Sequence, residues 1–157
     1  MIRSDVIDTA AGLDAADPLS NLRRFRVKVV DATQASHDAL LAQPVAGLSP
    51  ADRIRVAIHV CDTAGASSLR RHYAELLEKD SGKEEPPSSA LPALMHFAAM
   101  LTTNPRHGDR AAVGSLKAAG LDDAAIVALA QLVAFLSYQV RVVAGLQALR
   151  ASRGEVR

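Results

Sequence analysis

The spacing of apolar and polar residues along this chain predicts helices almost throughout. The strongest signal covers 121–151, which contains no proline and one internal glycine, Gly145. Its apolar residues form one row at alternating three- and four-residue steps and a second row on the adjacent face: Ile126, Leu129, Val133, Leu136, Val140 and Val143, then Leu132, Phe135, Val142, Leu146 and Leu149. A surface helix needs only one row, so two rows predict a long, largely buried C-terminal helix. In a chain of 157 residues such burial favours a partner subunit, and we expect a homo-oligomer formed through this helix.

A helical hairpin is predicted over 48–79. Ser49 followed by Asp52 resembles a capping box and Pro50 suits the first helical position, so a helix begins here. A small-residue elbow over 63–68 ends it, and a second helix is expected over 67–79. The apolar faces of the two helices hold Ile54, Ala57, Ile58 and Cys61 in the first, and Leu69, His72, Tyr73, Leu76 and Leu77 in the second.

Prolines, glycines and charged residues divide the rest of the chain. Residues 1–17 are expected to form a leader with one short helix around 6–11, and 18–157 to form a single helical domain. Pro18 suits the start of a helix running to about Gln43, with a break near 31–35 as an alternative. The charged, proline-containing segment 80–89 predicts a loop, and further helices are expected over 89–102 and 109–119.

Composition supports an all-α fold and narrows the function. Half of the chain is hydrophobic (49%), but aromatics make up only 3%, and this supply of small and unbranched side chains favours packed helices. A net charge of +1 argues against a nucleic-acid surface. A single cysteine fits a reducing compartment. With no export signal and no apolar run of membrane-spanning length apparent, we expect a soluble, cytoplasmic protein with no membrane partner.

The hairpin and the closing helix together carry a family resemblance. The first segment reads LSPADRIRVAIHVCDTAGASSLRRHY over 48–73, and the second reads AAGLDDAAIVALAQLVAFLSYQVRVVAGL over 118–146. They resemble the AhpD-like / carboxymuconolactone decarboxylase superfamily, in its peroxidase-related branch. Tyr138, Gln139 and Arg141 stand where that branch has an aromatic, amide and arginine cluster. The resemblance implies an all-α, AhpD-like helical domain with a central hairpin and a long C-terminal helix.

The chain departs from this family at the residues that carry its redox chemistry. Active members that it resembles use a Cys-x-x-Cys pair at the elbow as peroxidatic and resolving thiols, assisted by a glutamate and a histidine. Two registers are open for the thiols and the glutamate: Ala66, Leu69 and Ile54, or Gly65, Ser68 and Arg53. Neither keeps a thiol or the carboxylate, so a dithiol peroxidase at this elbow is excluded. Cys61 is expected to be a small buried hydrophobe and not a replacement thiol.

His72 is the one family position that survives, and it is the candidate catalytic residue. It lies on the inward row of its helix, where a hydrogen-bonded core histidine is an equally good interpretation. His96 is a second candidate, for lining a cavity. The five histidines show no metal-ligand spacing, so neither a metal nor a cofactor is expected.

Arginines in three places complete the candidate residues. Arg141 falls within the apolar closing helix and is expected to be paired if it is buried. The Arg23–Arg24 and Arg70–Arg71 pairs are expected on solvated faces or in salt bridges.

Two functional classes remain open. The first is a divergent AhpD-like protein without the redox dithiol, acting as a non-catalytic or small-molecule-binding oligomer. The second is an enzyme of changed chemistry, peroxidase-related or proton-transferring, that acts on a small apolar substrate in a cleft near His72. An enclosed cavity reaching His72 favours the enzyme, and a solid core there favours the non-catalytic protein.

Overall fold

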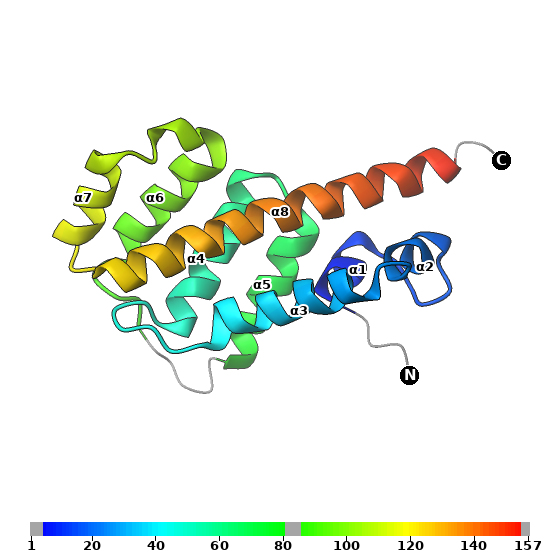
Figure 1. Cartoon of the computed structure of the whole chain (residues 1–157), viewed down its shortest axis with the longest axis horizontal. Coiled ribbons are helices and arrows are strands. Elements are labelled where there is room, and N and C mark those ends of the chain that lie inside the picture. Colours follow the sequence, from blue (N-terminus) through cyan, green and yellow to red (C-terminus); the bar gives the residue numbers. More distant parts are fainter. Residues whose placement is uncertain (1–4, 81–85, 155–157) are drawn as a thin grey trace.

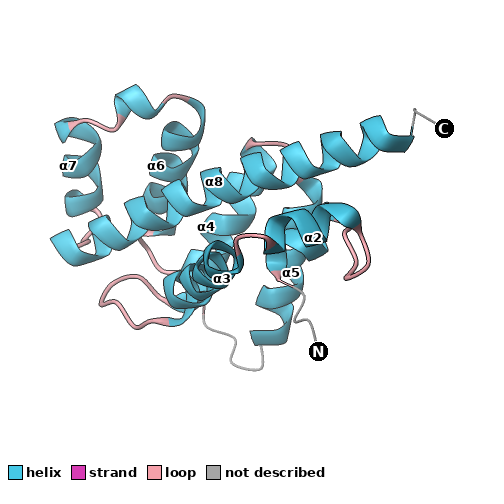
Figure 2. Ribbon diagram, turned by 45° about the vertical axis from the view of Figure 1, so that its right-hand side comes forward, coloured by secondary structure: helices cyan, strands magenta, loops and turns pink. Residues whose placement is uncertain are grey.

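The structure, a computed structural model, describes residues 5–80 and 86–154. All regular secondary structure in these ranges is helical, which confirms the all-α prediction (Figure 2). In chain order the elements are α1 (Val6–Ala11), α2 (Pro18–Arg24), α3 (Val27–Ala42), α4 (Pro50–Thr63), α5 (Ser67–Asp80), α6 (Leu91–Thr103), the 3₁₀ helix η1 (Pro105–His107), α7 (Arg110–Ala118) and α8 (Asp123–Gly154). The loop predicted over 80–89 lies partly outside the described residues.

The long helix α8 is the spine of the fold, and α1, α3, α4, α6 and α7 all contact it. In Figure 1 it crosses the molecule, with α6 and α7 at one end and α1 and α2 at the other. One face of α8 is buried against these helices through a row of side chains: Ile126, Leu129, Leu132, Val133, Leu136, Val143 and Leu146. The expected burial of the second apolar row is incomplete within one chain, since Leu149 is 51% exposed.

The same helix is long and apolar enough to cross a membrane by length and composition, which differs from the sequence prediction. This property is weak evidence, because the core helix of a helical domain meets the same criteria. In this fold α8 supplies apolar side chains to a core shared with several other helices.

The central hairpin forms as predicted. The Ser49 hydroxyl accepts a hydrogen bond from the Asp52 amide at 3.2 Å, and Pro50 is the first residue of α4. Gly65 then adopts a left-handed conformation, with φ of 68°, and the Ala66 amide donates to the Cys61 carbonyl at 2.8 Å. This closure turns the chain so that α5 packs against α4.

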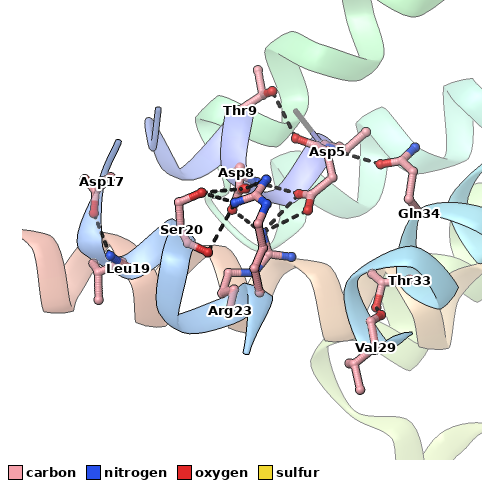
Figure 3. A network of polar contacts seen from close by, with 12 residues as sticks. Asp5, Asp8, Thr9, Asp17, Leu19, Ser20, Arg23, Val29, Thr33 and Gln34 are labelled. Atoms are coloured by element: carbon pink, nitrogen blue, oxygen red, sulfur yellow. Dashed lines mark hydrogen bonds and ion pairs between the residues drawn. The ribbon is translucent and has the colours of Figure 1, made fainter. Parts of the chain in front are cut away.

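The predicted single helix over 18–43 is wrong, because α2 and α3 are separate. The break is at Phe25–Arg26 and not near 31–35, and Arg26 has non-helical angles, with φ of −113° and ψ of 63°. Figure 3 shows Arg23 paired with Asp5, at 3.1 Å, and with Asp8. The Arg24 guanidinium also donates to Asp8, at 2.7 Å. These ion pairs hold α2 against α1, a constraint that the apolar pattern does not encode.

Residues 5–17, which the sequence assigns to a leader, contribute to the core. The short helix expected around 6–11 is confirmed as α1, with Asp5 as its N-cap. Ile7, Ala11 and Leu13 are buried, and α1 contacts both α5 and α8. The segment therefore shapes the surroundings of the elbow.

Candidate functional site

His72 lies where the sequence predicts, on the inward side of α5 and half-buried. Its Nε2 atom is 3.4 Å from Nε2 of His37, a buried residue of α3. Burial lowers the pKa of His72 below its usual 6.5, and the neighbouring His37 lowers it further. His72 is therefore neutral at pH 7 and available as a base.

The carboxylate of Asp38 contacts the inner histidine of this pair, His37. Nδ1 of His37 is 3.0 Å from Oδ1 of Asp38, which also accepts a hydrogen bond from the Gln34 side chain at 2.8 Å. Gln34 in turn accepts from the Val6 amide at 3.0 Å, so α1 helps to fix the group. The result is a chain of groups from Asp38 through His37 to His72. The sequence pattern gave no sign of it, because His37 is 35 residues from its partner.

A buried polar pair lies directly beside the histidines. Tyr73 has no exposed surface, and its hydroxyl donates a hydrogen bond to the side-chain oxygen of buried Gln139 on α8. The Tyr73 ring lies 5.1 Å from the His72 ring and 5.9 Å from the His37 ring, measured between centroids. Burial raises the pKa of Tyr73 far above its ordinary value, so the phenol stays protonated. This pair closes the inner side of the site with uncharged groups.

The only cysteine of the sequence, Cys61, is buried, and its thiol is poorly ionised. Cys61 has no exposed surface, as predicted. Burial, and secondarily the charge of Asp62, raises the pKa of its thiol to about 12. The thiolate is the nucleophile in peroxide reduction, so Cys61 does not replace the missing dithiol.

Other candidate residues lie away from His72. His96 is exposed and lines a cavity of about 390 Å³ between α6 and α7, which confirms the cavity-lining prediction. His107 and Asp109 line the same cavity. Arg141 is exposed and donates to the Ser137 carbonyl at 3.0 Å, so it forms no buried ion pair in the described part of the chain. A group of three metal-ligating side chains is likewise absent from the residues described.

Comparison with known proteins identifies the fold. No protein-family model matches the chain, and no curated protein matches it. Among solved structures it is similar to an uncharacterized peroxidase-related protein from Silicibacter sp. TM1040, with a TM-score of 0.60 over 92% of this chain and 93% of that chain. The two sequences are 18% identical, so the likeness shows the fold alone. The chain has an all-α fold similar to that of this peroxidase-related protein.

The positions at which the resemblance expects redox groups differ in burial and in contacts. Leu69 is fully buried in the core, whereas Ser68 is half-exposed and Gly65 is exposed. Arg53, one of the two glutamate positions, is buried, and its guanidinium donates to the Leu48 carbonyl at 3.1 Å and the Leu40 carbonyl at 2.9 Å. This arginine joins the end of α3 to the start of α4 and is a structural residue.

Proposed function

We propose that this chain is a divergent AhpD-like protein that has lost dithiol redox chemistry and acts as an oligomeric, non-catalytic or small-molecule-binding protein. One observation carries the proposal: the single thiol, Cys61, is buried with a raised pKa, while neither candidate register at the elbow contains a thiol. The core beside His72 supports the same conclusion, because Leu69 and Tyr73 are fully buried there. His72 also lines neither the cavity at His96 nor the one at Arg71 and Arg150.

Peroxide turnover tests the loss of redox chemistry. Purified protein is mixed with cumene hydroperoxide and excess dithiothreitol, and consumption is compared with that of the Cys61→Ser variant. We expect both proteins to match the protein-free background, because a thiol with a pKa of about 12 supplies almost no thiolate at neutral pH. Turnover that is well above background and disappears in Cys61→Ser would show that the redox function survives.

Oligomerisation through α8 is supported by apolar side chains that a single chain leaves uncovered. Leu149, near the end of α8, is 51% exposed, and Leu22 and Phe25 at the end of α2 are 65% and 87% exposed. The proposed occupant of the exposed apolar part of α8 is a second copy of the chain, since α8 carries a second apolar row that one subunit covers incompletely. Sedimentation equilibrium should show self-association that Leu149→Glu weakens. A monomer at every tested concentration would contradict this part of the proposal.

A second candidate function, proton transfer on a small molecule, is favoured by the Asp38–His37–His72 chain. Contacts of 3.0 Å and 3.4 Å connect the carboxylate to the inner imidazole and then to the outer one. A neutral His72 can accept a proton, and His37 and Asp38 can then share the charge that forms. The geometry supplies the base, and a substrate has to reach it through the half-exposed edge of His72.

Deuterium exchange tests this second function without a known substrate. The probe is a small lactone with an acidic α-proton, followed by NMR in deuterated buffer. If His72 is the base, the protein accelerates the exchange, His72→Gln removes the acceleration, and His59→Gln on the half-exposed side of α4 leaves it unchanged. Equal exchange with and without protein would reject a catalytic role for His72 toward this class of compound.

A further inference from the structure

A second hollow lies beside the elbow, between α1, α5 and α8. Its volume is about 540 Å³, and it is lined by the end of α1 together with Ser68 and Arg71 from α5 and Gln147 and Arg150 from α8. The residues of each pair are three positions apart on their helix, so they project to the same side. The hollow therefore receives one neutral hydrogen-bonding group and one arginine from each of two helices.

The described lining of this hollow carries positive charge and no carboxylate. Its lining contains two arginines and neither aspartate nor glutamate. In the part of the chain that the structure describes, Arg71 and Arg150 form no ion pair, in contrast to Arg23, Arg24 and Arg70. Two guanidinium groups that line one hollow carry like charge, and an anion between them would offset their repulsion.

The hydrogen bonds beside this hollow leave the Ser68 hydroxyl as a donor in its lining. The Gln147 amide donates to the Ala10 carbonyl at 3.2 Å and to the Ser68 hydroxyl at 3.3 Å. Because the Ser68 oxygen accepts this bond, its own proton is free to be donated to a ligand. Ser68 also lies in the first turn of α5, where the helix dipole favours negative charge.

Gly12 makes room for one of the arginines. It has a φ of 72°, and a Cβ atom placed on it would lie 2.5 Å from Nη1 of Arg150. The guanidinium therefore lies against the backbone at the end of α1, at the edge of the hollow. A larger residue at this position would both strain the backbone and displace the arginine.

We propose that this hollow binds a small anion, a carboxylate or phosphate group of a soluble molecule, with Arg71 and Arg150 as its main contacts. Planar guanidinium groups match the oxygen geometry of both groups, and the Ser68 hydroxyl adds a third donor. The site includes Ser68, one of the positions at which the resemblance expects a thiol. At this position the elbow carries a hydroxyl that can donate a hydrogen bond to an anion. The inference goes beyond the proposed function and does not depend on it.

The test is an NMR titration of nitrogen-15-labelled protein. One arm adds sodium phosphate and the other sodium succinate, both at neutral pH with sodium chloride adjusted to constant ionic strength. We expect saturable shifts of the Arg71 and Arg150 Nε–Hε signals in at least one arm, and the responding arm identifies the anion. Arg71→Ala and Arg150→Ala should each weaken binding about tenfold, the usual effect of losing a charge-assisted contact.

Matched variants separate a specific site from general surface charge. Arg70→Ala removes the adjacent arginine of α5, which pairs with Asp62 at 2.7 Å outside the hollow, and Arg153→Ala removes an exposed charge one turn beyond Arg150. Both should bind the anion as the unaltered protein does. Arg150→Lys keeps the charge without the planar fork and should bind with intermediate affinity. Shifts that do not saturate in either arm, or equal weakening by all the alanine variants, would overturn the proposal, while leaving the peroxide result untouched.

Discussion

The buried hydrogen bond between Tyr73 and Gln139 offers the sharpest test of how the polar layer is held in the core. Tyr73→Phe removes one hydroxyl and leaves the Gln139 oxygen without its tyrosine donor, in a position where the side chain is 1% exposed. Loss of one partner of a buried hydrogen bond costs about 1–3 kcal/mol. Gln139→Met, close to the original in volume, leaves the Tyr73 hydroxyl unsatisfied and should cost a similar amount.

The double variant distinguishes this reasoning from simple packing loss. Replacing both partners removes the bond and both unsatisfied groups, so its cost should be at least about 1 kcal/mol below the sum of the single costs. Urea unfolding at one fixed protein concentration measures all four proteins, since self-association changes apparent stability. Tyr138→Phe is the control. Tyr138 lies on α8 beside Gln139 and is 42% exposed, so removing its hydroxyl should change the free energy of unfolding by no more than about 0.5 kcal/mol. Additive single costs would refute the coupling.

Two further predictions follow from the pKa shifts. Because burial lowers the pKa of His72 in the folded state, the unfolded chain takes up a proton at this residue first as the pH falls below 6.5, and the stability of the protein should decline on acidification. Urea unfolding between about pH 5 and 8 should show a smaller decline for His72→Gln than for the unaltered protein. The same pH profile for both proteins would contradict a neutral His72 imidazole in the folded state. Cys61 is fully buried and its pKa is raised to about 12, so its reaction with an aromatic disulfide that releases a coloured thiolate should be slow in buffer and fast in denaturant. Rapid labelling of the native protein would show that the thiol is accessible.

Local patterns in the sequence predicted the helices well where each helix carries its own signals. Ser49 and Pro50 mark the start of α4, and the heptad-like spacing from Ile126 onward marks the buried face of α8. The break between α2 and α3 could not be predicted in the same way. It depends on ion pairs from Arg23 and Arg24 to α1, which are contacts between segments and leave no trace in hydrophobic periodicity.

The candidate site was predictable only in part for a related reason. The inward position of His72 follows from helical spacing, because Leu69 and Leu76 share its face. Its partners do not follow, since His37 comes from α3 and contacts it across 35 residues of sequence. The hollow at Arg71 and Arg150 could not be predicted for the same reason. In the sequence each arginine is an ordinary surface charge, and only the packing of α1, α5 and α8 places both in the lining of one hollow.

The elbow over 63–68 holds its shape without a thiol. Its shape rests on the left-handed Gly65, on the hydrogen bond from the Ala66 amide to the Cys61 carbonyl, and on the burial of Leu69. None of these requires a sulfur atom at the surface of the turn, so the turn is held by its backbone and by one buried side chain. On the exposed side of this turn, Ser68 lies beside two arginines without ion-pair partners in the described chain, and the proposed anion site rests on this arrangement.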